Sequence, residues 1–159
     1  MKTKMLKITT IALLLAVGGA SCTEKGESGN FVSIQYLKCE CDREVQYRRQ
    51  TSEKNILLLD AEKVTYDELP WFSENSKEIK YVICDFSLKV ASFKIYPKPN
   101  WLRVAYICNF PFDSSWDIPK EGIFISFTAE EFESCKGWSP NPETSCSDIV
   151  LTSLKIQTK

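Results

Sequence analysis

Ile79-Lys80-Tyr81-Val82-Ile83-Cys84-Asp85-Phe86 is the stretch that decides the fold class, because alternate residues place apolar side chains on one face. Side chains of a β-strand point by turns to the two faces of a sheet, so the pattern predicts a strand. Its β-branched and aromatic residues favour the same structure. Ile123-Phe124-Ile125-Ser126-Phe127 repeats the pattern further along. The chain is therefore predicted to be all-β.

Working outward, similar runs recur at short intervals and predict strands at 31–39, 55–59, 79–86, 91–96, 102–109, 122–127 and 149–156. The proline-containing stretches 97–100 and 111–115 cannot continue a sheet and mark connections. Short strands separated by turns are typical of a small antiparallel barrel or sandwich. Residues 31–159 are predicted to form one such domain.

Two Thr-x-x-Glu patterns interrupt the strands. Thr65 and Glu68 are spaced for a capped helical turn, which Pro70 would end at once. Residues 128–132 carry the same pattern and are predicted to form either a helical turn or an extended segment.

The N-terminus has the three parts of an export signal. Lys2, Lys4 and Lys7 precede the apolar run 11–17, and small residues follow directly before Cys22. A membrane span needs about 20 apolar residues, so this shorter run predicts a signal peptide that is removed. Residues 1–21 are therefore predicted to take no part in the fold.

Ala20, Ser21 and Cys22 resemble the lipobox of bacterial lipoproteins, with Gly19 where a leucine is usual. The resemblance implies that Cys22 is diacylated, becomes the new N-terminus and anchors the protein in the cell envelope, in the outer membrane. Residues 22–30 contain two glycines and no apolar periodicity, which is typical of a flexible tether. The alternative is ordinary cleavage after Ala20 or Ser21, which would release a soluble protein.

Length and charge restrict the function. Removal of residues 1–21 from the 159 leaves 138 residues, enough for one domain. Three of the 20 basic residues lie in the predicted signal peptide. The mature chain therefore has 17 basic and 21 acidic residues, which gives it a formal net charge of −4. Nucleic-acid binding demands a basic surface, so a nucleic-acid partner is not predicted. The membrane is predicted as a partner only through the lipid on Cys22.

All seven cysteines lie in the exported part, and setting aside an acylated Cys22 leaves six, an even number that supports the acylation. Thiols in an oxidising compartment are predicted to pair as disulfides: Cys39, Cys41, Cys84, Cys108, Cys135 and Cys146. Six cysteines allow fifteen pairings. Cys135 with Cys146 is the favoured pair, because the loop between them is rich in turn residues. Metal binding by Cys39 and Cys41 is the alternative, although zinc needs four ligands.

The chain contains no histidine, which excludes Ser-His-Asp catalysis, Cys-His catalysis and histidine-containing metal sites. No catalytic residue, metal or cofactor is predicted, and the protein is not expected to be an enzyme. A hydrolase that uses carboxylates alone is the less favoured alternative. Its candidate acids are Glu130, Glu131, Glu133, Asp113 and Asp117.

Four tryptophans stand beside prolines, serines or other loop residues: Trp71, Trp101, Trp116 and Trp138. Loop aromatics give flat contact area for a sugar or a protein partner, whereas the structural alternative is that they cap the ends of the barrel. Trp138 is the leading binding candidate, because it lies in the predicted Cys135–Cys146 loop.

The order of features resembles a group of uncharacterised Bacteroidales lipoproteins, through Lys38-Cys39-Glu40-Cys41-Asp42, the stretch 106–111 and the stretch 118–127. The Pro-x-x-Gly before an alternating strand is similar to OB-like barrels in such lipoproteins. The predicted function is non-enzymatic binding, or a structural role, toward a protein or glycan partner. An inhibitor or immunity factor that blocks a lytic enzyme is the alternative, with 139–142 as its protruding loop.

Overall fold

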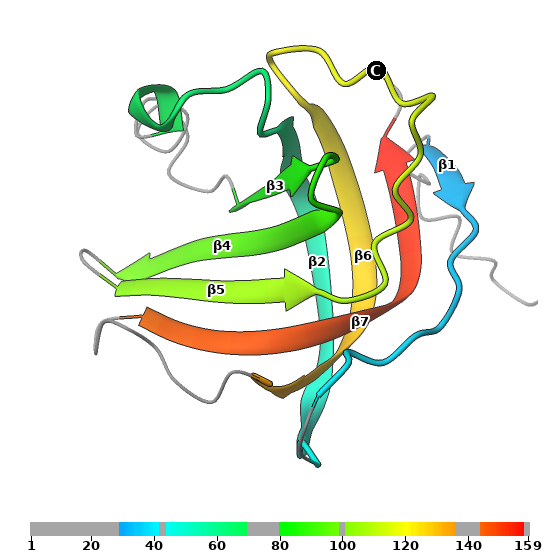
Figure 1. The fold of residues 1–159 in the computed structure, drawn as a ribbon, viewed down its shortest axis with the longest axis vertical. Helices are drawn as coiled ribbons and strands as arrows, with labels where there is room; N and C mark the ends of the chain where they lie inside the picture. The colour runs from blue at the N-terminus through cyan, green and yellow to red at the C-terminus, as the bar shows by residue number, and fades with distance from the viewer. Residues whose placement is uncertain (1–28, 42–43, 70–79, 99–100, 136–143, 158–159) are drawn as a thin grey trace, which may run out of the picture.

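The computed structural model describes residues 29–41, 44–69, 80–98, 101–135 and 144–157, which form a β-barrel (Figure 1). Its strands are β1 (Gly29–Val32), β2 (Tyr47–Asp60), β3 (Lys80–Asp85), β4 (Val90–Lys98), β5 (Trp101–Ile107), β6 (Ile123–Glu133) and β7 (Thr144–Gln157). One 3-10 helix, η1 (Tyr66–Glu68), follows β2. The predicted signal peptide, Cys22 and most of the predicted tether lie outside the described residues.

Six strands close the barrel in the order β7-β5-β4-β3-β2-β6, with β6 returning to β7. β1 pairs with the C-terminal part of β7 (residues 154–157), beyond the part that pairs with β5 (residues 144–149). The pairs β2–β3 and β5–β7 are parallel, and the remaining pairs are antiparallel. The all-β prediction is thus confirmed as a largely antiparallel barrel. It has six strands in the closed sheet, whereas an OB-fold has five.

The stretch that predicted the fold forms β3, and its alternation sorts the side chains as expected. Val82 and Cys84 join the core inside the barrel, while Tyr81 and Ile83 belong to a second apolar cluster. Phe93 and Phe127 meet edge to face across the interior, with ring centroids 5.6 Å apart. A barrel this small is filled by side chains, so a ligand must bind outside it.

Residues 56–59 of β2 are buried without alternation, because this half of the strand is covered on both sides. Ile56 and Leu58 belong to the interior core, and Leu57 and Leu59 belong to the second cluster. That cluster lies under the crossover segment (residues 61–69), which starts the connection between the parallel strands β2 and β3. The crossover segment thereby adds a layer outside the barrel.

The two Thr-x-x-Glu patterns have different outcomes. Thr65 donates hydrogen bonds from its backbone N–H and its hydroxyl to the Glu68 carboxylate, at 2.9 and 3.1 Å, and η1 forms as predicted. Residues 128–132 are part of β6, so the helical alternative is wrong there. Their backbone pairs with both β2 and β7, which keeps them extended.

The predicted strand 31–39 is right only for its beginning. β1 starts at Gly29, within the predicted tether, and ends at Val32. The strap (residues 33–41) continues across the outside of β7 (Figure 1). Two disulfides fix it: Cys39 bonds to Cys108 after β5, and Cys41 bonds to Cys135 after β6.

The favoured pairing of Cys135 with Cys146 is wrong, because the strap places Cys41 against Cys135, with their Cα atoms 5.3 Å apart. Cys84 and Cys146 are unpaired. Cys84 points into the barrel, where it behaves as a small apolar side chain. The even number of cysteines therefore gives no support to an acylated Cys22, and that prediction depends on the N-terminal motif alone.

Candidate functional site

The crossover pocket is a cavity of about 340 Å³ between the crossover segment and the outer face of β3 and β4. Its apolar walls come from both sides: Ala61, Val64, Leu69, Ile83 and Val90. Its polar groups are Thr65, Tyr66, Asp85, Ser92 and Lys94. The volume lies in the range of small-molecule sites, which are mostly apolar with a few polar groups.

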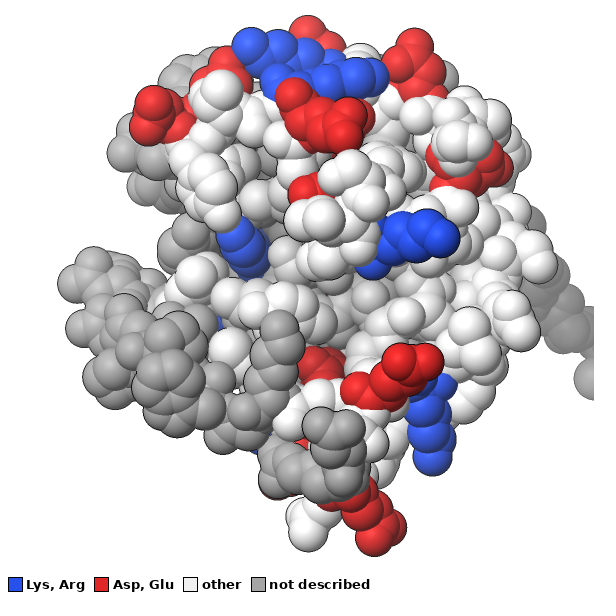
Figure 2. All heavy atoms as spheres, viewed as in Figure 1, with Lys and Arg blue, Asp and Glu red and all other residues white. Residues whose placement is uncertain are grey.

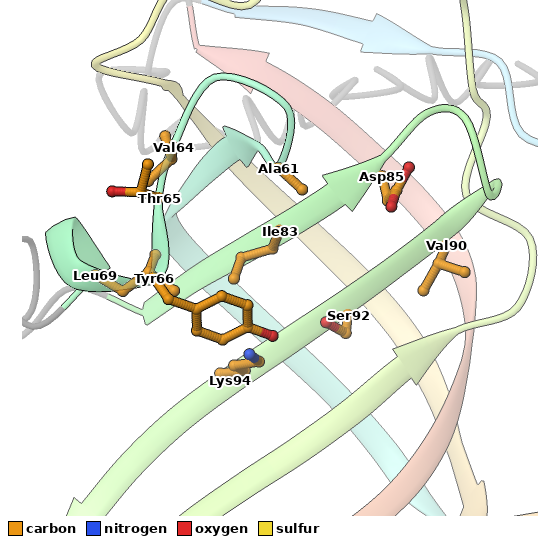
Figure 3. A pocket seen from close by; sticks show the side chains of 10 residues that line it. All are labelled: Ala61, Val64, Thr65, Tyr66, Leu69, Ile83, Asp85, Val90, Ser92 and Lys94. Atoms are coloured by element: carbon orange, nitrogen blue, oxygen red, sulfur yellow. The ribbon is translucent and has the colours of Figure 1, made fainter.

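Strand alternation explains which side chains reach this pocket. Ile83 pairs with Ser92, and Asp85 pairs with Val90, so these residues share the outer face of the β3–β4 ladder. Lys94 follows Ser92 on the same face of β4. Figure 3 shows Lys94 beside Tyr66 at one end of the pocket and Asp85 with Val90 at the other.

Lys94 is the half-buried cation of the pocket. Its Nζ lies 5.8 Å from the centroid of the Tyr66 ring, within the range of a cation–π contact. Burial lowers the pKa of Lys94 below its ordinary value. Within the described ranges, no acceptor forms a hydrogen bond or ion pair with its ammonium group. Among the lining residues that the structure describes, Lys94 therefore supplies a positive charge that lacks an anionic partner.

Asp85 does not neutralise this charge, because its carboxylate is held in the turn after β3. Its Oδ1 accepts hydrogen bonds from the Ser87 hydroxyl at 2.6 Å and from the Ser87 and Leu88 N–H groups, both at 3.1 Å. The hydrogen bond from the Ser87 hydroxyl is the main reason that the pKa of Asp85 lies below its ordinary value. The pocket consequently has a cationic end and an anionic end.

Ion pairs fix the crossover segment that forms one wall. Lys120 Nζ lies 2.7 Å from Glu68 Oε1, and this contact is the main reason that the pKa of Glu68 falls to about 2. Lys63 donates to the Ile118 carbonyl at 2.7 Å and to Asp117 at 3.0 Å. Both contacts join the crossover segment to the loop before β6, so the pocket has a supported rim.

The predicted binding tryptophans lie elsewhere or outside the described residues. Trp116 is half-buried and packs edge to face on Phe110, with centroids 5.7 Å apart, which agrees with the structural alternative. Trp101 begins β5. Trp71 and Trp138 lie outside the described residues, as does the inhibitor loop 139–142.

Two of the acids considered for a hydrolase are engaged at the end of β6. The Tyr36 hydroxyl donates to Glu130 at 2.6 Å. Glu131 is buried and forms ion pairs with Arg49 and Arg103. Burial by itself would raise the pKa of Glu131, but the hydrogen bonds from the two arginines outweigh it and the pKa is lowered. Glu131 is therefore a structural anion at neutral pH.

Two of the other acids, Asp113 and Asp117, are also in local contacts. Asp113 accepts a hydrogen bond from the Ser115 N–H at 2.8 Å, which lowers the pKa of Asp113, and Asp117 contacts Lys63. Glu133 ends β6. None of these acids lines the crossover pocket.

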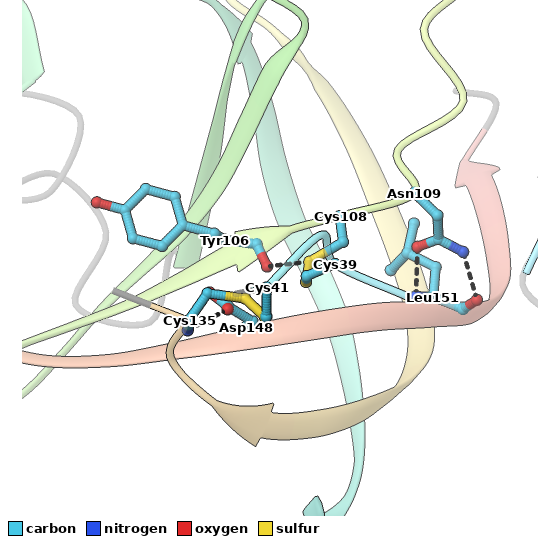
Figure 4. The surroundings of a disulfide bond; sticks show 8 residues. All are labelled: Cys39, Cys41, Tyr106, Cys108, Asn109, Cys135, Asp148 and Leu151. Atoms are coloured by element: carbon cyan, nitrogen blue, oxygen red, sulfur yellow. Dashed lines mark hydrogen bonds between the residues drawn. A yellow bond between two sulfur atoms is a disulfide. The ribbon is translucent and has the colours of Figure 1, made fainter. Parts of the chain in front are cut away.

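The disulfides surround a second group of polar atoms (Figure 4). The sulfurs of Cys39 and Cys135 and a carboxylate oxygen of Asp148 lie within 4.8 Å of one another. Metal binding needs thiolates, whereas both sulfurs are bonded to other cysteines. Asp148 accepts a hydrogen bond from the Cys135 N–H at 2.6 Å. The group is therefore a structural junction between the strap and the barrel.

Charges of both signs are interspersed on the face in Figure 2, which carries no continuous basic patch over its described residues. In the ranges that the structure describes, no helix has the length and apolarity to cross a membrane. Over its described residues, this face shows no basic stripe of the kind by which proteins track a phosphate backbone.

No family model matches the chain, and no curated protein matches it. The resemblance to Bacteroidales lipoproteins accordingly stays a prediction from the sequence.

Lys94 and Tyr66 were missed by the sequence analysis. The only sequence signal was a lysine within the predicted strand 91–96. Its significance comes from the crossover segment, which covers that face only because β2 and β3 are parallel neighbours.

Proposed function

We propose that the mature protein is a lipid-anchored, non-enzymatic binding protein of the bacterial cell envelope that holds its ligand in the crossover pocket. The observation that carries the proposal is the half-buried ammonium group of Lys94, which has no anionic partner among the described residues. A cation that is partly removed from water gains most from a bound anion. The filled barrel supports the choice of an outside site.

The scaffold, which is held by disulfides and ion pairs, favours binding over catalysis. Two disulfides hold the strap on the barrel. At the pocket itself, ion pairs hold the crossover segment against the loop before β6, so one wall is in place before a ligand arrives. A preformed site lowers the entropic cost of binding. Four of the five acids that could act in hydrolysis, Glu130, Glu131, Asp113 and Asp117, are engaged in structural contacts away from this pocket.

The N-terminal motif supports the proposed location in the cell envelope. Its basic head, short apolar run and Ala20-Ser21-Cys22 sequence favour export and acylation of Cys22. Expression of the full precursor in a bacterium tests the anchor. We expect the wild-type protein in the membrane fraction and Cys22→Ala in the soluble fraction, and continued membrane association of Cys22→Ala would contradict the anchor.

A photo-cross-linker tests the pocket in living cells. Benzoylphenylalanine is placed at Tyr66, which is 81% exposed at the pocket, and separately at Phe31, which is 77% exposed on β1. Mass spectrometry of the labelled peptide detects small and large adducts alike. We expect a defined adduct at position 66 and none at position 31. Equal labelling at both positions, or none, would contradict a binding role for this pocket.

A further inference from the structure

We propose that the crossover pocket binds the carboxylate of a small amphipathic acid, with the carboxylate on Lys94 and the apolar part along Ile83, Val64 and Leu69. This inference rests on the proposed binding function and names the chemical class of the ligand. The ligand chemistry is a single carboxylate joined to an aliphatic group of a few carbons.

The charge of the ligand follows from the two ends of the pocket. Lys94 supplies one positive charge, and the ionised Asp85 at the opposite end repels further negative charge. A phosphate carries more charge and is commonly bound by arginine forks or by several backbone N–H groups. No arginine lines the crossover pocket among the described residues. A monoanion is therefore the better match.

Polar neighbours define the place of the carboxylate. The Ser92 hydroxyl is on the same face of β4 as Lys94, two residues away, and the Tyr66 ring lies beside the ammonium group (Figure 3). A carboxylate has two oxygens, each able to accept more than one hydrogen bond. One oxygen on Lys94 and one on Ser92 would satisfy both donors.

Aliphatic side chains define the rest of the ligand. The walls beyond Lys94 are Val64, Leu69 and Ile83, and these belong to the apolar cluster outside the barrel. Each methylene that leaves water there adds about 0.8 kcal/mol. A short aliphatic group would thus extend the second cluster.

The same chemistry has two sources, a free acid and the C-terminal residue of a peptide. Hexanoate represents the first, and acetyl-Gly-Gly-Leu with a free C-terminus represents the second. Hexanamide and the C-terminal amide of the peptide are the matched uncharged probes. Binding of each probe to the whole mature protein, from which the signal peptide has been removed, is measured by isothermal titration calorimetry.

We expect at least one of the two acids to bind and its amide to bind about 10- to 100-fold more weakly, because the amide loses a charge-assisted hydrogen bond. Stronger binding of the peptide would identify a peptide C-terminus as the source, and stronger binding of hexanoate a free acid. Absence of binding by both acids, or equal binding of an acid and its amide, would overturn the inference.

Lys94→Met should reduce the affinity for the acid by the same factor. Lys155→Met is the matched control, because Lys155 also lies 5.8 Å from an aromatic centroid, that of Phe31, but does not line the crossover pocket. Equal losses in the two variants would contradict a role for Lys94. If Lys94→Met fails to fold, the comparison of acid and amide still decides. A cross-link at position 66 without acid binding would leave the binding function standing and remove only the ligand class.

Discussion

The side-chain amide of Asn109 forms two hydrogen bonds with the backbone of Leu151, one to its carbonyl at 2.9 Å and one from its N–H at 2.7 Å. The same amide nitrogen donates to the Gln35 carbonyl at 3.0 Å. One buried side chain thereby joins the loop after β5, the strand β7 and the strap, and Figure 4 shows its two hydrogen bonds with Leu151. This link holds the strap independently of the disulfides.

Asn109→Asp should lower the free energy of unfolding by about 1–3 kcal/mol at neutral pH, because a carboxylate cannot donate to the Leu151 and Gln35 carbonyls. Urea unfolding measures the change. Asn30→Asp, at an exposed position of β1, is the control and should change stability little. Equal stability of Asn109→Asp and the wild type would show that the strap does not depend on this amide.

Glu131 should make the stability depend on pH in the acid range. Its pKa in the folded protein lies below the ordinary value of 4.5, so the unfolded chain binds protons first as the pH falls. The stabilisation is therefore complete above about pH 4.5 and is lost as the pH falls through the folded pKa.

Glu131→Gln should be less stable than the wild type at pH 7 by about 1–3 kcal/mol, because the ion pairs with Arg49 and Arg103 are lost. Its stability should also fall less steeply than that of the wild type as the pH falls below the ordinary carboxyl pKa of 4.5. Denaturant titrations at several pH values measure both effects. The exposed Glu62→Gln should keep the wild-type profile, and a wild-type profile for Glu131→Gln would refute the role of this ion pair.

The two unpaired thiols should differ in reactivity. Burial, with a smaller contribution from Asp60, raises the pKa of Cys84 above its ordinary value, so little thiolate is present. Cys146 is only half-buried on β7. A maleimide should label Cys146 in the native protein and Cys84 only after unfolding, as followed by peptide mass spectrometry. Equally fast labelling of Cys84 would place it outside the core.

Each disulfide should add stability, because each closes a long loop. The partners are 69 residues apart for Cys39 and Cys108 and 94 apart for Cys41 and Cys135. The chain-entropy relation gives about 4–5 kcal/mol for loops of this length. Replacement of either pair by serines should lower the free energy of unfolding by roughly this amount, measured in urea.

Because both bonds hold the same strap, removal of both pairs should cost less than the sum of the two single removals. Cys146→Ser is the control with little effect. If the two losses in the free energy of unfolding simply added up, each disulfide would stabilise the protein independently of the other.

The strand pattern was readable because it is local. The alternation in 79–86 and 122–127 reports directly which side chains enter a core, and both became strands. The runs at 55–59 and 149–156 marked only the buried parts of β2 and β7. The outer halves of those long strands carry polar residues, so their pairing with neighbours was not visible in the sequence.

The disulfides and the pocket depend on contacts between distant segments. Cys135 and Cys146 are close in sequence, but the strap brings Cys41 to Cys135 from 94 residues away. Lys94 likewise becomes half-buried only when the crossover segment passes over β3 and β4. No local sequence pattern predicts the contact of Cys41 with Cys135 or the covering of Lys94. Both follow from the closure of the barrel through two parallel strand pairs.

Peptide mass mapping under non-reducing conditions, on protein purified from the envelope, tests the lipid anchor and the two disulfides most directly. It should find Cys39 linked to Cys108, Cys41 linked to Cys135, unpaired Cys84 and Cys146, and an N-terminal peptide that begins with acylated Cys22. A link between Cys135 and Cys146, free thiols at Cys39 and Cys41, or an N-terminus without lipid would contradict it.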